Sequence, residues 1–277
     1  LEQELGTPES RRDVSVSLDN VAGIELQLGK HESALEKYTE SLEIRRVLEQ
    51  ELGTPESRSD VSISLDYVAR IESQLGKHES ALEKYTESLE IRRGLEQELG
   101  TPQSRRNVSY SLDNVAGIEL QLGKNESALK KHTESLEIAR ALEQELGTPE
   151  SRRNVSFSLD NVAGIELQLG KNESALEKYT ESLDIRRALE QELGVPQSRR
   201  DVSFSLDNVA GIELQLGNHE SALAKYTESR DIRRALADQL GTIGDINALA
   251  WSICLISRMM IKQDPAKALA KISEGHQ

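Results

Sequence analysis

Cysteine is nearly absent from this sequence, with Cys254 alone among 277 residues. Because one thiol cannot form an intrachain disulfide, we expect a fold without crosslinks and a reducing, cytoplasmic location. No run reaches the roughly 18 apolar residues that a membrane span needs, so we expect no membrane contact. No secretory signal is visible, but the chain begins inside a repeat and without methionine. We therefore expect a fragment of a longer protein, in which missing signals carry little weight.

Aromatic residues are also scarce, at 3%, and hydrophobic residues make up only 36% of the sequence. This is thin for a globular enzyme of this length. Clustered basic residues are missing as well, since Lys and Arg alternate with Asp and Glu and the net charge is −14. Binding to phosphates needs clustered Lys and Arg, so the composition argues against nucleic acid and favours neutral or basic protein partners.

No group of residues suited to catalysis assembles in the sequence. The five histidines lie whole repeats apart, without the carboxylates or thiols that would complete a metal site. Cys254 lies in an apolar run without a base nearby, and the glycines stand singly and form no phosphate-binding loop. We therefore predict no enzyme activity, no metal and no cofactor.

What the sequence does contain is one stretch that recurs at a constant offset of 47 residues. It first appears whole from Leu18 to Arg46, as LDNVAGIELQLGKHESALEKYTESLEIRR. A fixed period between 20 and 50 residues is typical of stacked-repeat proteins. We predict a single array over residues 1–277, in which residues 1–7 end a preceding helix and residues 242–277 form a divergent last unit. The five full units are expected at about 8–53, 54–100, 101–147, 148–194 and 195–241.

Each unit is predicted to hold two antiparallel helices of about 20 residues, joined by short turns. Gly53-Thr54-Pro55 combines a helix stop, a cap and a first-turn proline, and Gly29 marks the second break. Valine replaces the capping threonine at Val195. Helical spacing predicts two buried stripes, one on each helix. They are Val14, Leu18, Val21, Ala22 and Leu28 on the first helix, and Ala34, Tyr38, Leu42, Leu48 and Leu52 on the second.

These residues resemble the tetratricopeptide repeat (TPR) family. The matching positions are Leu18, Val21-Ala22, Gly29, Ala34 and Tyr38. The proline that usually closes a unit is missing and the period is long, which resembles the variants in kinesin light chain and in bacterial signalling proteins. The resemblance implies an all-α, right-handed superhelix (a solenoid) of antiparallel helix pairs. It also implies that the first helices line a concave groove that binds a peptide or protein segment, without catalysis.

The repeats differ most informatively at the position of Val16, whose equivalents are Ile63, Tyr110, Phe157, Phe204 and Trp251. Residue 16 lies about 200° around the helix from Val14, opposite the buried stripe. One turn later stands an asparagine that could hold peptide backbone, and Gly23 follows, leaving room for a ligand. In the second unit Tyr67 and Arg70 replace the asparagine and the glycine, and they could form an anchoring pair.

The predicted binding residues are Val16, Asn20, Ile63, Tyr67, Arg70, Tyr110, Asn114, Phe157, Asn161, Phe204, Asn208 and Trp251. Two alternatives stay open at this point. The residues at the Val16 position could pack against the preceding unit instead of lining a groove. The Tyr67 and Arg70 changes could be neutral drift in a duplicated array.

Three substitutions predict weak joints between helices: His132 for the buried tyrosine, Ala139 for Arg45, and Arg230 for the Leu42-type core residue. In the last unit, residues 245–261 are apolar almost all round, which is typical of a helix buried on several sides. That helix could be a divergent first helix packed within the array, followed by a short helix from Asp264. It could instead be exposed and mediate self-association.

Two functional hypotheses follow. The first is a protein-interaction module that binds a peptide or protein segment in the groove of the first helices. The second is a structural or regulatory spacer, or an oligomerisation domain, within a larger bacterial signalling or effector protein whose catalytic part lies elsewhere.

Overall fold

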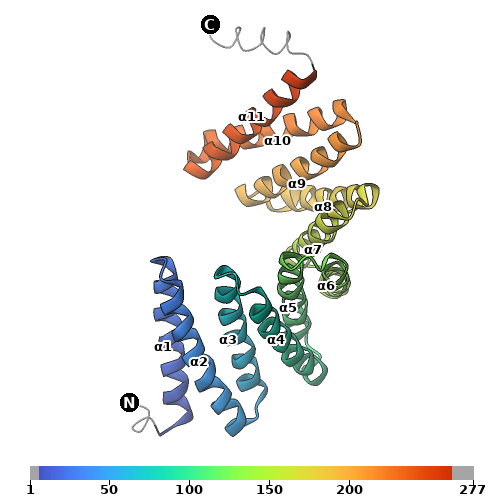
Figure 1. Ribbon diagram of the computed structural model, residues 1–277. Coiled ribbons are helices and arrows are strands. Elements are labelled where there is room, and N and C mark those ends of the chain that lie inside the picture. The colour runs from blue at the N-terminus through green and yellow to red at the C-terminus, as the bar shows by residue number, and fades with distance from the viewer. Residues whose placement is uncertain (1–5, 264–277) are drawn as a thin grey trace. The chain divides into compact units, whose positions relative to one another are not determined.

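The computed structural model describes residues 6–263 and contains, over that range, eleven α-helices and no β-strand (Figure 1). The helices are α1 (Pro8–Gln27), α2 (His31–Leu52), α3 (Pro55–Gln74), α4 (His78–Leu99), α5 (Pro102–Gln121), α6 (Asn125–Leu146), α7 (Pro149–Gln168), α8 (Asn172–Leu193), α9 (Pro196–Gln215), α10 (His219–Leu240) and α11 (Ile243–Gln263). The predicted all-α class is confirmed. The short helix expected from Asp264 lies outside the described residues.

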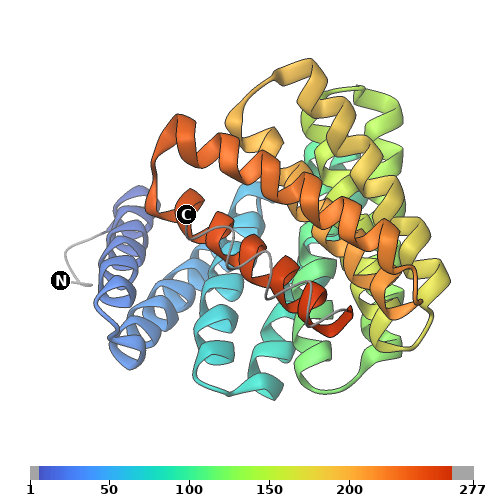
Figure 2. The ribbon, with the colours of Figure 1, turned by 90° about the horizontal axis from the view of Figure 1, so that it is seen from above.

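The chain divides into two compact units, Leu1–Leu142 and Glu143–Gln277, at a point within α6. In the first unit each helix from α1 to α5 packs against the next, and in the second unit α7 to α11 do the same. Figure 2 shows this order from a second direction. None of the described helices is long and apolar enough to cross a membrane.

The helix ends follow from local sequence. Thr54 begins α3 by accepting a hydrogen bond from the Ser57 backbone N–H at 3.2 Å, and Pro55 occupies the first turn. Val195 offers no side-chain cap at the corresponding end of α9, as predicted. The second helices α2, α4, α8 and α10 end at glycines in the left-handed conformation, with φ 60° at Gly53. The same four helices begin without a side-chain cap.

Each first helix after α1 has two packing faces. In α3, Val68 and Ile71 are buried in one cluster with Ala22 and Leu42 of the preceding pair. Ala69 faces the other way and packs in a second cluster with its own partner helix α4. The predicted stripe of the first helix is therefore the surface between consecutive helix pairs, and the alanine is the close approach within a pair.

Two parts of the predicted stripes are wrong. In α1, Val21 and Leu28 are exposed, because no described helix precedes α1 to cover them. On the second helix Leu52 is 48% exposed, because it stands in the last turn, beyond the contact with the neighbouring helices.

A buried arginine joins three helices at a time. Arg186 of α8 is 2% exposed, and its Nη2 lies 2.6 Å from Asp160 Oδ2 of α7. Its Nε donates to Ser156 Oγ of α7 at 3.3 Å, and its Nη1 donates to Ser205 Oγ of α9 at 2.6 Å. We call the arginines that make this aspartate pair and this forward serine bond the arginine staples. They are Arg45, Arg92, Arg186 and Arg233.

We expect Arg186→Met to lower the free energy of unfolding by about 3–5 kcal/mol, since it leaves Asp160 buried without its cation. Replacing both partners, in Arg186→Met/Asp160→Leu, should recover most of that loss because no unpaired buried charge remains. Urea unfolding followed by circular dichroism measures both changes. The control is Arg187→Ala, which removes an exposed pair with Glu228 and should change little. Equal losses for Arg186 and Arg187 would contradict the staple.

Candidate functional site

The predicted apolar ligand contacts are exposed. The side chains at the Val16 position stand on the first helices of both units, and their exposed fractions run from 36% for Ile63 to 64% for Trp251. Buried residues of the same helices are far less accessible, as Val68 shows at 1%. Large apolar groups on this side of the first helices are therefore accessible to a ligand. We call the six side chains the apolar ladder; they are Val16, Ile63 and Tyr110 in the first unit, and Phe157, Phe204 and Trp251 in the second.

Two of the staple arginines lie against aromatic rings of the apolar ladder. In the second unit, the Arg186 guanidinium lies 5.1 Å from the Phe157 ring centroid and 5.7 Å from that of Phe204. Arg153 approaches Phe157 as well, at 5.6 Å. In the first unit, Arg92 lies 5.6 Å from the Tyr110 ring. Cation–π contacts of this length hold an aromatic ring in place while part of it stays exposed.

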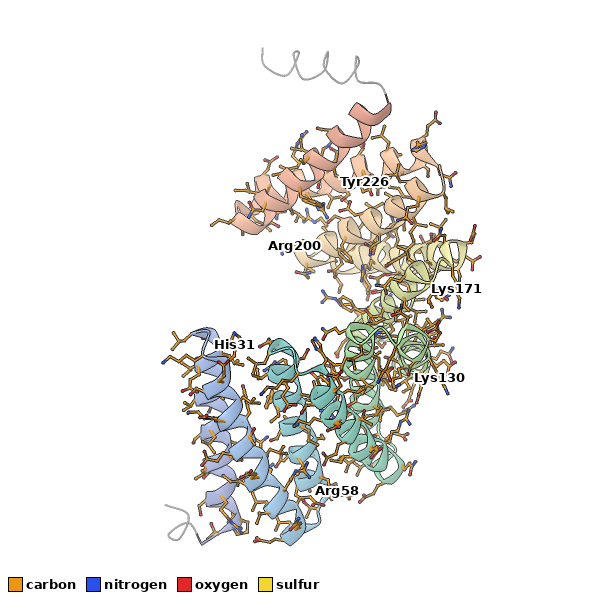
Figure 3. The ribbon with its side chains drawn as sticks, in the orientation of Figure 1. His31, Arg58, Lys130, Lys171, Arg200 and Tyr226 are labelled. Atoms are coloured by element: carbon orange, nitrogen blue, oxygen red, sulfur yellow. The ribbon has the colours of Figure 1, made fainter. Side chains whose placement is uncertain are left out.

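Ion pairs tie successive first helices together beside the ladder. In the second unit Arg153 of α7 pairs with Asp201 of α9 at 2.8 Å. Arg200 of α9, labelled in Figure 3, then makes two hydrogen bonds of 2.9 Å to the Asp245 carboxylate of α11. These bonds hold the pKa of Asp245 below its usual value. The pairs fix the spacing between the aromatic side chains of neighbouring helices.

The asparagines occupy the next turn on the same side. Asn20 and Asn161 are exposed, whereas Asn114 and Asn208 are half-buried. The Nδ2 atom of Asn114 is buried and has no hydrogen-bond partner within the described residues. The exposed amides of Asn20 and Asn161 are the ones that a ligand carbonyl could reach.

Tyr67 and Arg70 of α3 do contact each other, as the sequence suggested. The Arg70 guanidinium lies 5.4 Å from the Tyr67 ring, and that ring lies 5.0 Å from the ring of Tyr38. Tyr38 is buried, and burial raises its pKa. The nearby positive charge of Arg70 acts in the opposite direction, but more weakly. Arg70 itself is exposed, so its positive charge lies at the surface, beside the Tyr67 ring.

The glycine that follows the asparagine does not leave an empty space in most repeats. A Cβ at Gly164 would meet the Tyr179 hydroxyl of the partner helix at 3.5 Å, and Gly23 and Gly211 have the same neighbour at 3.8 Å and 3.6 Å. Only beside Gly117 is there nothing within 4 Å among the described residues, because His132 replaces the tyrosine there. In these repeats the glycine therefore lies beside the tyrosine hydroxyl, which bounds the predicted room for a ligand on that side.

The substitutions at His132 and Ala139 belong together. Ala139 removes the staple arginine from α6, which would leave the Asp113 carboxylate of α5 without a cation. His132 replaces that partner, and its Nδ1 lies 2.7 Å from Asp113 Oδ1. The predicted weak joint is thus partly compensated. Arg230, the third substitution, turns to its neighbour Asp231 at 2.7 Å and does not remain unpaired.

The staples themselves are the functional residues that sequence reasoning missed. Arg45 and Arg46 are adjacent on the second helix, yet Arg45 is buried and Arg46 is exposed. The signal for the buried role of Arg45 was the joint change in the third unit, where the arginine and the tyrosine are lost together. Two substitutions in one repeat are more informative as a pair than as two separate losses.

The last helix is only partly buried. Ile256 and Ser252 of α11 are buried, whereas Ile243, Ile246 and Ile253 are exposed. The prediction of a helix buried on several sides, made for residues 245–261, is therefore wrong for residues 245–257. The side chains of Met259, Met260 and Ile261 lie outside the described residues.

A hollow that is large enough for a small ligand lies outside the apolar ladder. It measures about 830 Å³, lies along α10 on Leu223, Thr227 and Ile232, and no residue of the apolar ladder lines it. Among the described residues, no three His, Cys, Asp or Glu side chains gather in a way that could hold a metal ion.

Residues 13–94 match a family model described as tetratricopeptide repeat. A sequence search of curated proteins gave no match. Among solved structures, BtubC (BKLC) from P. vanneervenii is 22% identical, with a TM-score of 0.64 and 83% of each chain covered. A Podosopora anserina putative kinesin light chain with nearly identical TPR-like repeats is 15% identical, with a TM-score of 0.62 over 84% of this chain and 98% of its own. A Rap protein complexed with competence and sporulation factor is 16% identical, with a TM-score of 0.54 over 93% of this chain and 72% of its own.

We expect the His132 and Ala139 positions to be energetically coupled. His132→Tyr alone removes the partner of Asp113, and Ala139→Arg alone brings a cation to a carboxylate that already has a hydrogen-bond partner. The double variant restores the residue pair of the other repeats, so it should be more stable than the sum of the two single changes predicts, by about 1 kcal/mol or more. Thermal melts of the four proteins measure the coupling. Additive effects would show that the two substitutions are independent.

Proposed function

We propose that this chain is a protein-interaction scaffold of the tetratricopeptide repeat type, which binds a segment of another protein along its first helices. The observation that carries the proposal is the apolar ladder. Exposed aromatic side chains at one position of successive helices are unusual in a sequence with only 3% aromatic residues. Phe157 and Phe204 both lie against Arg186, and exposed apolar side chains that gather in this way mark interaction sites.

The second unit offers the stronger half of the site. Phe157, Phe204 and Trp251 stand on α7, α9 and α11, and Arg186 holds the first two rings. Aromatic side chains that are already fixed lose little conformational freedom when they bind, which favours affinity. Asn161 and Asn208 would bond the backbone of a bound segment.

The first unit would give different contacts. Val16, Ile63 and Tyr110 are less aromatic as a set, and the exposed Arg70 on Tyr67 adds a positive charge. Asn20 and Asn114 again supply amides. A segment that binds the first unit would therefore meet a mixed apolar and cationic surface.

The structural neighbours support the class of partner. The Rap protein has the same fold and is solved with competence and sporulation factor, so this helix arrangement is compatible with binding another molecule. We propose no catalytic role for the chain itself.

The test is a peptide-display selection against the chain, repeated on Phe157→Ser/Phe204→Ser. We expect a consensus peptide whose affinity falls at least about tenfold in the variant, since each buried aromatic contact contributes roughly 1.5–3 kcal/mol. Thermal melts of both proteins should be close, because both rings are about half exposed in the free chain.

The matched control is Leu193→Ser, which removes a leucine that is 45% exposed at the end of α8, away from the ladder. It should leave peptide binding unchanged. If no peptide is selected and the phenylalanine variant melts much lower, the ladder is a packing surface, and the spacer hypothesis replaces the scaffold.

A further inference from the structure

The aromatic rings of the second unit stand in one repeating register. A staple arginine of α8 donates to Ser205 Oγ of α9 at 2.6 Å, and a staple arginine of α10 donates to Ser252 Oγ of α11 at 2.7 Å. Phe204 and Trp251 directly precede these serines, so both rings have the same place on their helices. Although α9 has the first helices α7 and α11 on its two sides, Phe204 is 52% exposed. The exposure of this side therefore does not come from a missing neighbour.

The spacing of two rings follows from the arginine that contacts both. The Arg186 guanidinium lies 5.1 Å from the Phe157 centroid and 5.7 Å from the Phe204 centroid. The helices that carry the rings pack together, with Ala163 of α7 and Val202 of α9 in one buried cluster. Packed helices have axes about 8–10 Å apart, and the two arginine distances allow the centroids at most about 11 Å. A ligand on successive rings therefore needs equivalent side chains about 8–11 Å apart.

Few backbone conformations repeat their side chains at this interval. In a β-strand the side chains of one face recur after about 6.5–7 Å, which is too short. A polyproline II helix has three residues per turn and rises about 3.1 Å per residue, so every third side chain returns after about 9.3 Å. In an α-helix a side chain returns to the same face after seven residues, or about 10.5 Å. The rings therefore fit a polyproline II segment or an α-helix.

The exposed charged groups beside the rings are hydrogen-bond donors. In the ion pairs that tie the first helices together, the side chains of Arg153 and Arg200 are 40% and 37% exposed. Their carboxylate partners, Asp201 and Asp245, are 16% and 5% exposed. The acceptor side of each pair is thus turned away from a ligand, and the donor side is open to it.

Amide donors follow the rings along each helix. Asn161 stands one turn after Phe157, and Asn208 stands one turn after Phe204. An α-helix uses its carbonyl groups internally and offers these donors little. A polyproline II helix has no internal hydrogen bonds, and proline has no N–H, so such a segment presents unpaired acceptors. The partial charges of the two surfaces are therefore complementary for a proline-rich segment.

We propose that the second unit binds a proline-rich segment of a partner protein in the polyproline II conformation. Prolines three residues apart lie on Phe157, Phe204 and Trp251. The carbonyls between them accept hydrogen bonds from Asn161 and Asn208. Because proline fixes its own φ, the segment loses little conformational entropy when it binds. This proposal rests on the proposed function, since it names the class of segment that the ladder takes.

The test uses the full chain and two fluorescein-labelled peptides of identical composition. One is Pro-Ala-Ala-Pro-Ala-Ala-Pro, with prolines three residues apart, and the other is Pro-Ala-Pro-Ala-Ala-Ala-Pro. Fluorescence anisotropy should show saturable binding of the first peptide with a Kd below about 1 mM. The second peptide should bind about fivefold or more weakly, because its middle proline misses the Phe204 ring.

Variants of the chain locate the contact. Phe204→Ser should weaken binding of the first peptide about tenfold or more, because the middle ring is lost. Tyr110→Ser is the matched control: it removes a ring at the same repeat position in the first unit, with 58% exposure against 52%, and should leave binding unchanged. Asn161→Leu/Asn208→Leu keeps the size of both side chains but removes the donors, and should weaken binding about fivefold. Circular dichroism checks that each variant keeps its helices.

Three results would overturn the proposal. The first is no saturable binding of the first peptide below about 1 mM. The second is equal affinity for the two peptides, and the third is equal weakening by Phe204→Ser and Tyr110→Ser.

The peptide-display selection separates this proposal from the proposed function. A selected consensus without prolines three residues apart, lost in Phe157→Ser/Phe204→Ser, would refute the proline-rich ligand and leave the scaffold standing. If nothing is selected and neither proline peptide binds, both proposals fall. Enrichment of proline at every third position supports both.

Discussion

The structure depends on a buried positive charge. Each arginine staple places a guanidinium between a second helix and the first helices on both sides of it, as Arg186 does between α7 and α9. Such a charge is tolerated in a low-dielectric interior only where a carboxylate and further hydrogen bonds meet it. The aspartate and the serines of the first helices therefore have to recur with the arginine. The distance between successive helix pairs is therefore determined by hydrogen-bond geometry as well as by apolar packing.

The same contact links the interior to the surface. Arg186 bonds Asp160 on one side, and its guanidinium lies against the exposed rings of Phe157 and Phe204. The rings are thus held by a group that the core has already fixed. A bound segment would meet a surface whose spacing is set by the staples and by the pairs Arg153–Asp201 and Arg200–Asp245. The interior of a repeat array and its candidate binding surface are in this way built from one network.

The third repeat shows how far the network can change. It replaces the arginine by Ala139 and the tyrosine by His132, and the aspartate still has a nitrogen partner at 2.7 Å. The change lies in α6, the helix within which the two compact units divide. A sequence that repeats itself closely elsewhere thus departs from its pattern in a chemically compensated way, because a buried carboxylate must be satisfied by some donor.

The sequence by itself determined where the helices lie and where they begin and end. Glycine, threonine and proline at the breaks act through the local backbone, so no distant residue is needed. It also predicted the stripe that holds Leu65 and Val68, but not that Ile71 joins it, and it left open whether the position of Phe157 faces a groove or a neighbouring helix. Only the tertiary structure decided which of two adjacent arginines is buried, since Arg45 and Arg46 differ by about 100° around one helix and the neighbours of each are remote in sequence. It likewise decided that Val68 is covered while Val21 is open. Whether a side chain is buried depends on the helix that packs against it. The same valine is therefore buried in α3 and exposed in α1.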